Sequence, residues 1–378
     1  MFSCSSWWVG HRVGRSLVLD NRWKDKSVLA LTITPGVANS LEVREVPAPS
    51  PEEGEVLVDA LSVGLCGTDV EIVAGEFGAA PPGQDYLVLG HENLGRVAEA
   101  PAGSSLVAGD LVVGIVRRPD PVPCGACAAG EWDMCLNGRY TERGIKELDG
   151  FARQQWRADP EALVKLEPGL ERVGVLLEPA TVVAKAWEQI ERIGRRAYFE
   201  PRTVAVTGAG PVGLLAALIG IQRGLEVHVY DLVTDGPKPA LVRDLGAAYH
   251  TDSLQDSQVR PDVIIECTGV APVILEAITG GGQNAITCLT GISGVGRKTP
   301  IDLGDLNRTA VLQNEVIFGT VNANKRHYTA AGAALAAADT SWLERLITRR
   351  VSIDNFRDAF DQQDDDVKVV LDFPEVQS

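Results

Sequence analysis

The first half of the chain alternates short apolar runs with turns rich in Gly and Pro. From residue 28 to about residue 180, these runs have the alternation expected of half-buried strands, at 28–33, 55–63, 87–98 and 110–116. Short strands separated by turn residues predict a compact, mostly antiparallel β domain. The pattern becomes helical over 171–193 and leads into a linker at 195–201.

The second half alternates strands and helices. The predicted order is strand, helix, strand, helix, strand, helix, strand, strand, at 203–207, 212–223, 227–232, 238–245, 263–267, 272–278, 285–290 and 316–321. Such alternation predicts an α/β fold with a parallel, doubly wound sheet. The link between residues 249 and 262 is short, so one crossover helix is expected to be reduced. Helices from about residue 326 and a last strand at 367–373 are predicted to pack back on the first domain.

The length and composition of the chain agree with two domains, each with its own hydrophobic core. At 378 residues the chain exceeds one ordinary domain, and 45% apolar with 23% charged residues is typical of a globular protein. We therefore expect a first domain at 28–190, a second at 191–322 and a closing segment at 323–378. No stretch of the sequence is predicted to span a membrane.

The first 27 residues differ from the rest of the chain. They carry five Lys and Arg against two acids, and they contain three Trp. They lack the apolar core of a secretory signal, although an Arg- and Ser-bearing transit-like arm remains open. We expect a disordered or mis-assigned start, and we interpret Val28, where a strand pattern begins abruptly, as the true first residue, encoded by a codon other than ATG.

Charge and cysteine content limit the partners and the compartment. A net charge of −16 argues against nucleic acid or an anionic membrane as a partner. Three of the seven cysteines fall between residues 124 and 135. This clustering favours a metal site in a reducing compartment over a disulfide framework, and it predicts a cytoplasmic protein.

A glycine-rich turn opens the second domain. Gly208, Gly210 and Gly213 form a G-x-G-x-x-G pattern between a predicted strand and a predicted helix. The first glycine permits a tight turn, the second lets the backbone approach a pyrophosphate, and the third lets strand and helix pack closely. The helix N-terminus would then face the phosphates. The alternative is a glycine turn with a structural role alone.

Asp231 bears on which nicotinamide cofactor is used. It closes the second strand of this domain, 18 residues after Gly213. A carboxylate there can accept hydrogen bonds from both ribose hydroxyls, and it would repel a 2′-phosphate. NAD is therefore favoured over NADP, although Lys238 and Arg243 are close enough in sequence to leave NADP open.

Three motifs in the first domain offer ligands for zinc. Cys66 offers a thiolate, His91 an imidazole, and Glu92 or Glu178 a carboxylate. Taken singly, a free cysteine is more often a small buried apolar residue, and an isolated histidine is more often structural. The ordered set, followed by the dinucleotide turn, is what predicts a catalytic zinc site.

With these motifs the chain resembles the zinc-dependent medium-chain dehydrogenase/reductase family over essentially all of 28–378. Within the family it is most similar to the glucose 1-dehydrogenase group. The strings that carry the resemblance are at 87–92, 116–119, 142–145, 149–151, 159–160, 177–179 and 319–322. The resemblance implies a GroES-like, mostly antiparallel β catalytic domain and a Rossmann domain.

The resemblance also implies roles for particular residues. Cys66, His91 and Glu92 would hold the catalytic zinc, with Glu178 as an exchangeable fourth ligand near the substrate. Thr68 would bind the reacting hydroxyl and relay its proton, while Glu142 and Asn322 would touch sugar hydroxyls. The residues implied to line the cofactor are Gly208, Ala209, Gly210, Pro211, Val212, Gly213, Asp231, Thr290, Gly291, Ile292, Thr320, Val321 and Asn322.

The chain departs from the group at the substrate and at the cofactor. Val116, Val182 and Leu312 stand where glucose enzymes commonly have polar residues toward the sugar. Each unpartnered buried hydroxyl would cost roughly 1–3 kcal/mol, so these positions could shift substrate preference. The arginines that usually hold the NADP phosphate are also missing.

A cysteine-rich segment matches part of the family's structural zinc site. Cys124, Cys127 and Cys135 correspond to the last three of its four ligands, while Pro121 replaces the first. The adjacent Asp120 could complete a site of three sulfurs and one oxygen. The alternative is a metal-free lobe with three reduced thiols, although a segment with so little apolar surface favours a metal.

The predicted activity is oxidation of an aldose at C1 to the lactone, with hydride transfer to NAD(P). The nearest alternative is a polyol or another alcohol as substrate, and a more distant one is a catalytically silent NAD-binding protein. A regulatory nucleic-acid binder is disfavoured by the acidic balance. The family suggests a homodimer or homotetramer, with the strand at 316–321 at an interface.

Overall fold

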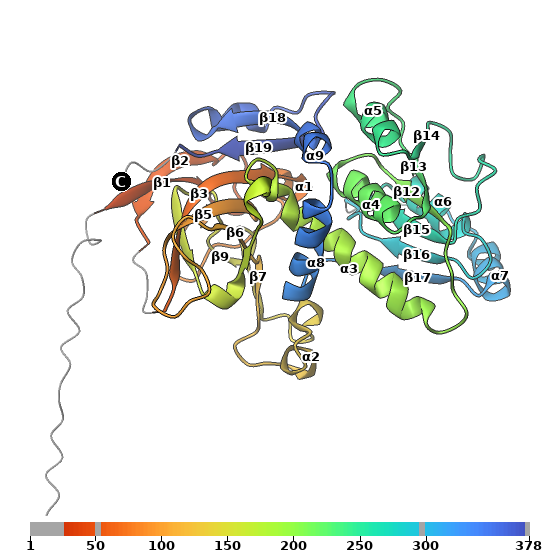
Figure 1. Cartoon of the computed structure of the whole chain (residues 1–378), viewed down its shortest axis with the longest axis horizontal. Helices are drawn as coiled ribbons and strands as arrows, with labels where there is room; N and C mark the ends of the chain where they lie inside the picture. Colours follow the sequence, from red (N-terminus) through yellow and green to blue (C-terminus); the bar gives the residue numbers. More distant parts are fainter. Residues whose placement is uncertain (1–25, 50–53, 295–298, 375–378) are drawn as a thin grey trace, which may run out of the picture.

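The computed structural model describes residues 26–49, 54–294 and 299–374 and places two domains side by side (Figure 1). The expectation that Val28 is the true start concerns residues 1–27, of which residues 1–25 lie outside the described part. Ser27 already belongs to the first strand, and Ala48 N–H donates to the carbonyl of Lys26 at 2.9 Å.

The first domain is built mainly from antiparallel strands. Its central sheet has the order β11-β6-β5-β3-β19-β18, with β10 also paired to β3. Smaller sheets have the orders β2-β1-β4 and β7-β8-β9. The strands up to the linker helix are β1 Ser27–Ile33, β2 Glu42–Pro47, β3 Val56–Leu65, β4 Leu87–Val88, β5 Glu92–Glu99, β6 Leu111–Gly114, β7 Arg117–Arg118, β8 Thr141–Arg143, β9 Glu147–Leu148, β10 Gln155–Ala158 and β11 Leu163–Lys165.

Short helices and 3-10 turns connect these strands. Helix α1 follows β3 directly, and helix α2 lies in the cysteine-rich segment that projects from the domain in Figure 1. The bounds are α1 Gly67–Val73, α2 Gly125–Ala128, η2 Trp132–Met134, η3 Pro160–Ala162, η4 Pro168–Leu170 and η5 Gly174–Leu176.

The second domain is a parallel sheet of the order β14-β13-β12-β15-β16-β17. The strand order reverses between β12 and β15, and dinucleotides bind at the carboxyl ends of the strands at such a switch point. Its elements are β12 Thr203–Thr207, α4 Pro211–Gln222, β13 Glu226–Tyr230, α5 Pro237–Asp244, β14 Ala248–His250, β15 Val263–Glu266, α6 Ala271–Thr279, β16 Ile286–Leu289, α7 Leu303–Gln313 and β17 Val316–Gly319. Both predicted architectures, a mostly antiparallel β domain and a parallel, doubly wound sheet, are therefore present in the structure.

Two details of this domain bear on the predictions. The link between β14 and β15 contains turns and no helix among residues 251–262, as its length indicated. Helix α7 was not predicted, and none of its side chains is buried. Its large apolar residues Leu303, Val311 and Leu312 are exposed, so within one chain the helix packs little of its apolar surface.

The C-terminal segment returns to the first domain. It contains α8 Lys325–Ala336, α9 Thr340–Leu346, β18 Ile347–Ser352, η6 Ile353–Ala359 and β19 Lys368–Asp372. Strand β19 pairs with β3 inside the first domain's central sheet, and α8 lies along the linker helix α3 (Leu177–Gly194) in Figure 1. Among the described residues, no helix has the length and apolar character needed to cross a bilayer.

Helix α3 belongs to a core shared by the two domains. Its Trp187, 1% exposed, lies in one apolar cluster with Leu94 of β5, Val204 of β12 and Leu335 of α8. Because these residues come from both domains and from the C-terminal segment, burial of α3 fixes the domains relative to each other.

Trp187→Ala should therefore lower the free energy of unfolding by about 3–5 kcal/mol, the usual cost of removing a buried Trp. Urea denaturation followed by circular dichroism measures this loss. The matched control is Tyr198→Ala, because Tyr198 is 83% exposed and its removal should change stability by less than about 0.5 kcal/mol. Equal effects of the two substitutions would contradict the shared core.

Candidate active site and zinc centres

The thiolate, imidazole and first carboxylate predicted as zinc ligands come together in the first domain. Cys66 joins β3 to α1, while His91 and Glu92 stand at the start of β5. One ligand atom from each of the three side chains lies within 4.8 Å of the others, and Cys66 Sγ is 3.1 Å from His91 Nε2. Gly90 has a φ of +88°, and this turn directs His91 toward Cys66.

Asp69 orients this group, and the sequence reasoning missed it. Its fully buried carboxylate accepts the backbone N–H of Cys66 at 3.0 Å, and its other oxygen is 3.5 Å from His91 Nδ1. Burial alone would raise the pKa of Asp69, but the charge and hydrogen bond of His91, the backbone N–H of Cys66 and the charge of Lys368 together lower that pKa. Likewise, burial lowers the pKa of His91, while Cys66 and Asp69 together raise it well above the ordinary value. The sequence did contain a signal for Asp69, because this acidic residue stands three positions after the predicted ligand Cys66 in the same motif.

Lys368 is a second partner that the sequence did not reveal. Its Nζ lies 2.7 and 2.6 Å from the two carboxylate oxygens of Glu92 and donates to the carbonyl of Leu65 at 3.0 Å. Both side chains are almost fully buried. Burial would lower the pKa of Lys368, but the charges of Glu92 and Cys66 raise it. The charge of Glu92 is thus balanced by a lysine 276 residues later in the chain.

Glu178 and Thr68 lie on helices beside this group. Glu178 begins α3, and its ligand atom is outside the set of three that lies within 4.8 Å. Burial, aided by the charge of Glu92 and opposed by that of His91, raises the pKa of Glu178 to about 7. Thr68 is partly exposed in the first turn of α1.

The two residues implied to bind sugar hydroxyls touch each other. Asn322 Nδ2 donates to Glu142 Oε1, although the two are 180 residues apart. Arg117 also binds this oxygen, with Nε at 3.1 Å and Nη2 at 3.0 Å. Glu142 and Arg117 are buried, and Asn322 has the left-handed φ of +64°.

The dinucleotide turn has the geometry that its glycines predict. Gly208 has a φ of +89°, and a Cβ atom on Gly213 would lie 1.8 Å from the carbonyl oxygen of Gly208. Nothing lies within 4 Å of a Cβ built on Gly210, so this edge is open toward a ligand. Asp231 accepts the backbone N–H of Ala209 at 2.7 Å and that of Val233 at 3.0 Å.

A hollow of about 260 Å³ adjoins this turn and is lined in part by Gly208, Asp231 and Thr268. Lys238 Nζ is 3.6 Å from Asp231, whereas Arg243 stacks 5.9 Å from the Tyr249 ring centroid. Lys238 and Arg243 are the two basic side chains that left NADP open. Of these two, only Lys238 directly faces the carboxylate of Asp231.

Glu266, at the end of β15, holds the neighbouring cofactor loops. Its carbonyl oxygen accepts from Thr290 N at 2.8 Å and Thr290 Oγ1 at 2.7 Å, while its carboxylate accepts from Thr268 N at 2.7 Å. A Cβ on Gly291 would lie 2.1 Å from Gly269 N, so this loop needs glycine. The sequence signal for Glu266 was an acidic residue that closes an apolar strand.

The three apolar replacements lie in different environments. Val116 is 3% exposed and adjoins Arg117, while Val182 is partly buried in α3. Leu312 is 61% exposed on α7, which Figure 1 places at the outer edge of the second domain. The structure therefore does not bring Leu312 to Glu142 and Asn322 within one chain, because α7 packs outside the sheet that carries the cofactor turn.

The cysteine-rich segment brings three sulfur ligands together, and Asp120 does not join them. The ligand atoms of Cys124, Cys127 and Cys135 lie within 4.8 Å of one another. The backbone N–H groups of Cys127 and Leu136 lower the pKa of Cys124 to about 6.

The carboxylate of Asp120 instead accepts from Val122 N and Asn137 Nδ2, both at 2.8 Å. The assignment of Asp120 as the fourth ligand is corrected on this ground, because its carboxylate makes these local hydrogen bonds and is not among the ligand atoms that lie within 4.8 Å of one another.

Comparison with known proteins identifies the family. Residues 52–168 match the alcohol dehydrogenase GroES-like domain, and residues 171–373 match the glucose dehydrogenase C-terminus. The chain belongs to the zinc-dependent medium-chain dehydrogenase/reductase family, close to glucose dehydrogenases. Similar members of this dehydrogenase family include the glucose 1-dehydrogenases of Methanocella arvoryzae, 39% identical over 91% of this chain and 99% of the relative, and of Thermoproteus tenax, 39% identical over 90% and 98%.

A solved dehydrogenase of the family has a similar structure. The glucose dehydrogenase of Haloferax mediterranei, in complex with NADP, zinc and gluconolactone, superposes with a TM-score of 0.85 at 30% identity. The match covers 92% of this chain and 100% of the other.

Cys66→Ala should abolish dehydrogenase turnover, by roughly a thousandfold or more, because Lewis-acid polarisation contributes several kcal/mol. Cofactor affinity should change by less than about threefold, since the Rossmann domain is untouched. Metal analysis should show one zinc fewer per chain. The matched control is Cys288→Ala, a buried cysteine of β16, which should keep its zinc and its activity. Full turnover in Cys66→Ala would contradict the ligand role.

Proposed function

We propose that this chain oxidises an aldose, D-glucose or a related sugar, at C1 to the lactone and transfers the hydride to NAD(P). The group formed by Cys66, His91 and Glu92 is the observation that carries the proposal. It stands in a family member whose relatives over nine-tenths of the chain are named glucose 1-dehydrogenase.

The donor set of this group fits zinc. Zinc accepts thiolate, imidazole and carboxylate ligands, and three protein ligands leave a position open for a substrate. Buried Asp69 supports the proposal, because zinc-ligating histidines usually donate their second ring N–H to a carboxylate. When zinc is bound there, it polarises the substrate hydroxyl and lowers the pKa of that hydroxyl.

The chain's own residues would position the sugar and move its proton. We assign to Thr68 the hydrogen bond to the reacting hydroxyl and the outward relay of its proton. Glu178, whose pKa burial raises to about 7, is the exchangeable carboxylate beside it. Glu142 and Asn322 would orient the sugar through its other hydroxyls. Loss of the hydroxyl proton and transfer of the C1 hydride to the nicotinamide then give the lactone and reduced cofactor.

Val116 and Val182 favour a second candidate, oxidation of a polyol or another alcohol by the same machinery. Both residues are apolar where glucose enzymes commonly meet the sugar with polar groups. A catalytically silent NAD-binding protein is disfavoured, because such a protein has no need of the assembled Cys66, His91 and Glu92 side chains.

Two further assignments belong to this proposal. We assign a structural zinc to Cys124, Cys127 and Cys135, whose three converging sulfurs support it; a fourth ligand other than Asp120 would be needed. We also propose a homodimer or homotetramer assembled through β17, the last strand of its sheet among the described residues. Exposed apolar side chains on and near this strand support it, at Ile301, Leu303, Val311, Leu312, Ile317 and Val321.

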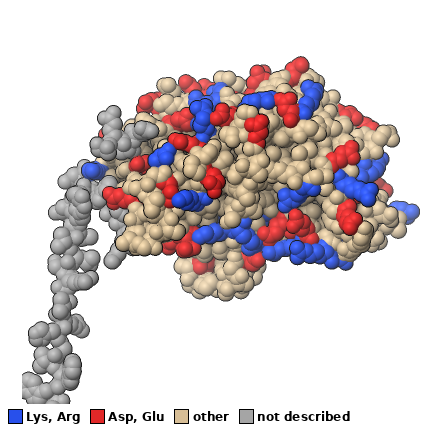
Figure 2. All heavy atoms as spheres, in the orientation of Figure 1, with Lys and Arg blue, Asp and Glu red and all other residues tan. Residues whose placement is uncertain are grey.

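Neither nucleic acid nor a membrane is part of the proposed function. Acidic and basic side chains are interspersed on the face shown in Figure 2, and the chain carries a net charge of −16. The described cysteines are free thiols, which supports a reducing, cytoplasmic setting.

The experiment that tests the proposed function is the initial rate of nicotinamide reduction by zinc-replete enzyme with glucose, galactose, xylose, sorbitol and simple alcohols. We expect aldoses to be oxidised to lactones, detected by their hydrolysis to the aldonic acid. Turnover with sorbitol or alcohols alone would overturn the aldose proposal and support the second candidate.

For the cofactor we propose a preference for NAD, although the Haloferax mediterranei enzyme is in complex with NADP. Asp231→Ser should lower the ratio of kcat/KM for NAD over NADP by roughly tenfold or more, because it removes a charge that repels the 2′-phosphate. The matched control is Asp235→Ser, an exposed acid of the same loop, which should leave the ratio unchanged. A wild-type preference for NADP would contradict the assignment to Asp231.

A further inference from the structure

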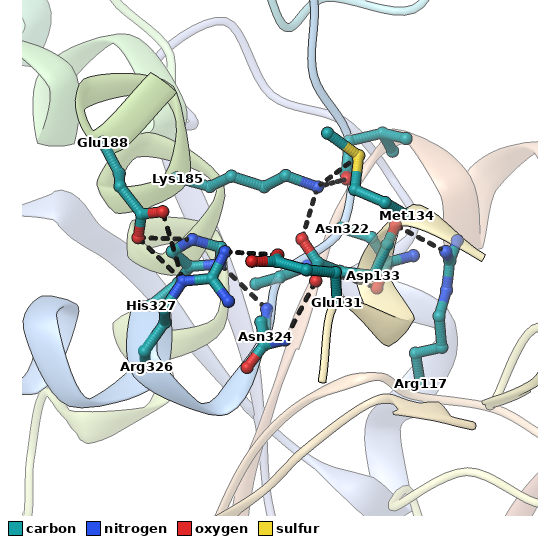
Figure 3. Close-up of polar contacts among 12 residues, drawn as sticks. Arg117, Glu131, Asp133, Met134, Lys185, Glu188, Asn322, Asn324, Arg326 and His327 are labelled. Carbon is teal, nitrogen blue, oxygen red and sulfur yellow. Dashed lines mark hydrogen bonds and ion pairs between the residues drawn. The ribbon is translucent and has the colours of Figure 1, made fainter. Parts of the chain in front are cut away.

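A buried ion pair lies outside the residues assigned so far. Lys185 Nζ of α3 is 2.9 Å from Asp133 Oδ2 of η2, and their side chains are 1% and 0% exposed. Figure 3 shows that the pair is the centre of a polar network joining the cysteine-rich segment, α3 and the start of α8. Two buried charges are costly to desolvate, and an apolar pair of similar volume often serves stability equally well. The pair therefore calls for an explanation beyond stability.

Each charge of this pair holds one end of the segment that contains Asn322. Lys185 Nζ donates to the carbonyl of Val321 at 3.0 Å. The other carboxylate oxygen of Asp133 accepts Asn324 Nδ2 at 3.0 Å. Asn322 lies between these two anchors with a φ of +64°, a conformation that costs energy for a residue other than glycine.

Asp133 also reaches the other half of the proposed sugar site. Its carbonyl oxygen accepts Arg117 Nη1 at 3.0 Å. The same guanidinium binds the Glu142 oxygen that accepts the Asn322 amide. Asp133 thus contacts both halves of the proposed sugar site. Its carboxylate holds the segment that contains Asn322, and its main-chain carbonyl binds the guanidinium that holds Glu142.

From these contacts we propose that Asp133 is a positioning residue for the substrate, which sets Asn322 against Glu142 through Lys185, Asn324 and Arg117. Asp133 stands two residues before Cys135 in the cysteine-rich segment. This segment then helps to position the sugar-binding residues and is not only a separate structural lobe. This inference rests on the proposed function, because it needs Glu142 and Asn322 to bind sugar hydroxyls.

The same segment provides a matched control in Glu131. Its carboxylate pairs with Arg326 at 2.7 Å and Arg192 at 3.7 Å, on α8 and α3. These pairs bridge the same elements as the Asp133 network, but their side chains are 33–47% exposed and anchor helices rather than residues 321–324. Glu131→Gln therefore removes a charge from the segment without releasing Asn322.

The test measures sugar KM, cofactor KM, kcat and the thermal unfolding midpoint for the full-length zinc-loaded enzyme. Asp133→Asn should raise the sugar KM by roughly ten- to a hundredfold, since a displacement of about 1 Å in a positioning contact has effects of that order. Cofactor KM should change by less than about threefold. Glu131→Gln should leave the sugar KM within about twofold.

A double variant separates positioning from stability. Asp133→Leu combined with Lys185→Met replaces both charges by apolar side chains of similar volume, so its unfolding midpoint should recover toward the wild-type value. Its sugar KM should nevertheless stay high, because both anchors of 321–324 are lost. A sugar KM that recovers together with the midpoint, or that never rises in Asp133→Asn, would overturn the inference.

Asn322→Ala distinguishes this failure from failure of the proposed function. If Asn322→Ala raises the sugar KM and Asp133→Asn does not, the positioning role alone is wrong. If neither variant changes the sugar KM, both the role of Asn322 and the inference built on it are wrong.

Discussion

Burial of helix α3 is the constraint on which the rest of the molecule depends. The helix is packed into one apolar core with residues of both domains and of α8, so it fixes the first domain, which carries Cys66, His91 and Glu92, relative to the cofactor turn of the second. The same helix carries Glu178 at its start and Lys185 in its middle. Its apolar face therefore sets the relative position of the domains. Of its polar side chains, Glu178 lies near His91 and Glu92, and Lys185 pairs with Asp133 of the cysteine-rich segment.

The charges inside the first domain are balanced by residues distant in sequence. Glu92 is paired with Lys368, His91 with Asp69, and Lys185 with Asp133. A buried charge without a partner would be strongly destabilising, so each functional group constrains a second residue. Lys368 lies on β19, so the return of this strand to the first domain's sheet places its ammonium group against the carboxylate of Glu92.

Much of the fold and part of the site could be predicted from the chain. The period-two runs and the strand–helix alternation indicated the two architectures, and the glycine spacing indicated the turn at Gly208. Helix α7 escaped prediction, and it buries none of its side chains within the chain. Asp120 was assigned by adjacency in sequence, but short-range hydrogen bonds to Val122 and Asn137 decide where its carboxylate points.

The sequence by itself determined the order of motifs, the acidic balance and the ligand types, because these depend on residue identity and local periodicity. Only the tertiary structure decided which of these groups meet. The contact of Asn322 with Glu142, the pairing of Lys368 with Glu92 and the anchoring of residues 321–324 by Asp133 all join segments far apart in the chain. No local pattern encodes such contacts, since they arise when apolar burial brings separate elements together and each buried polar group then requires a partner.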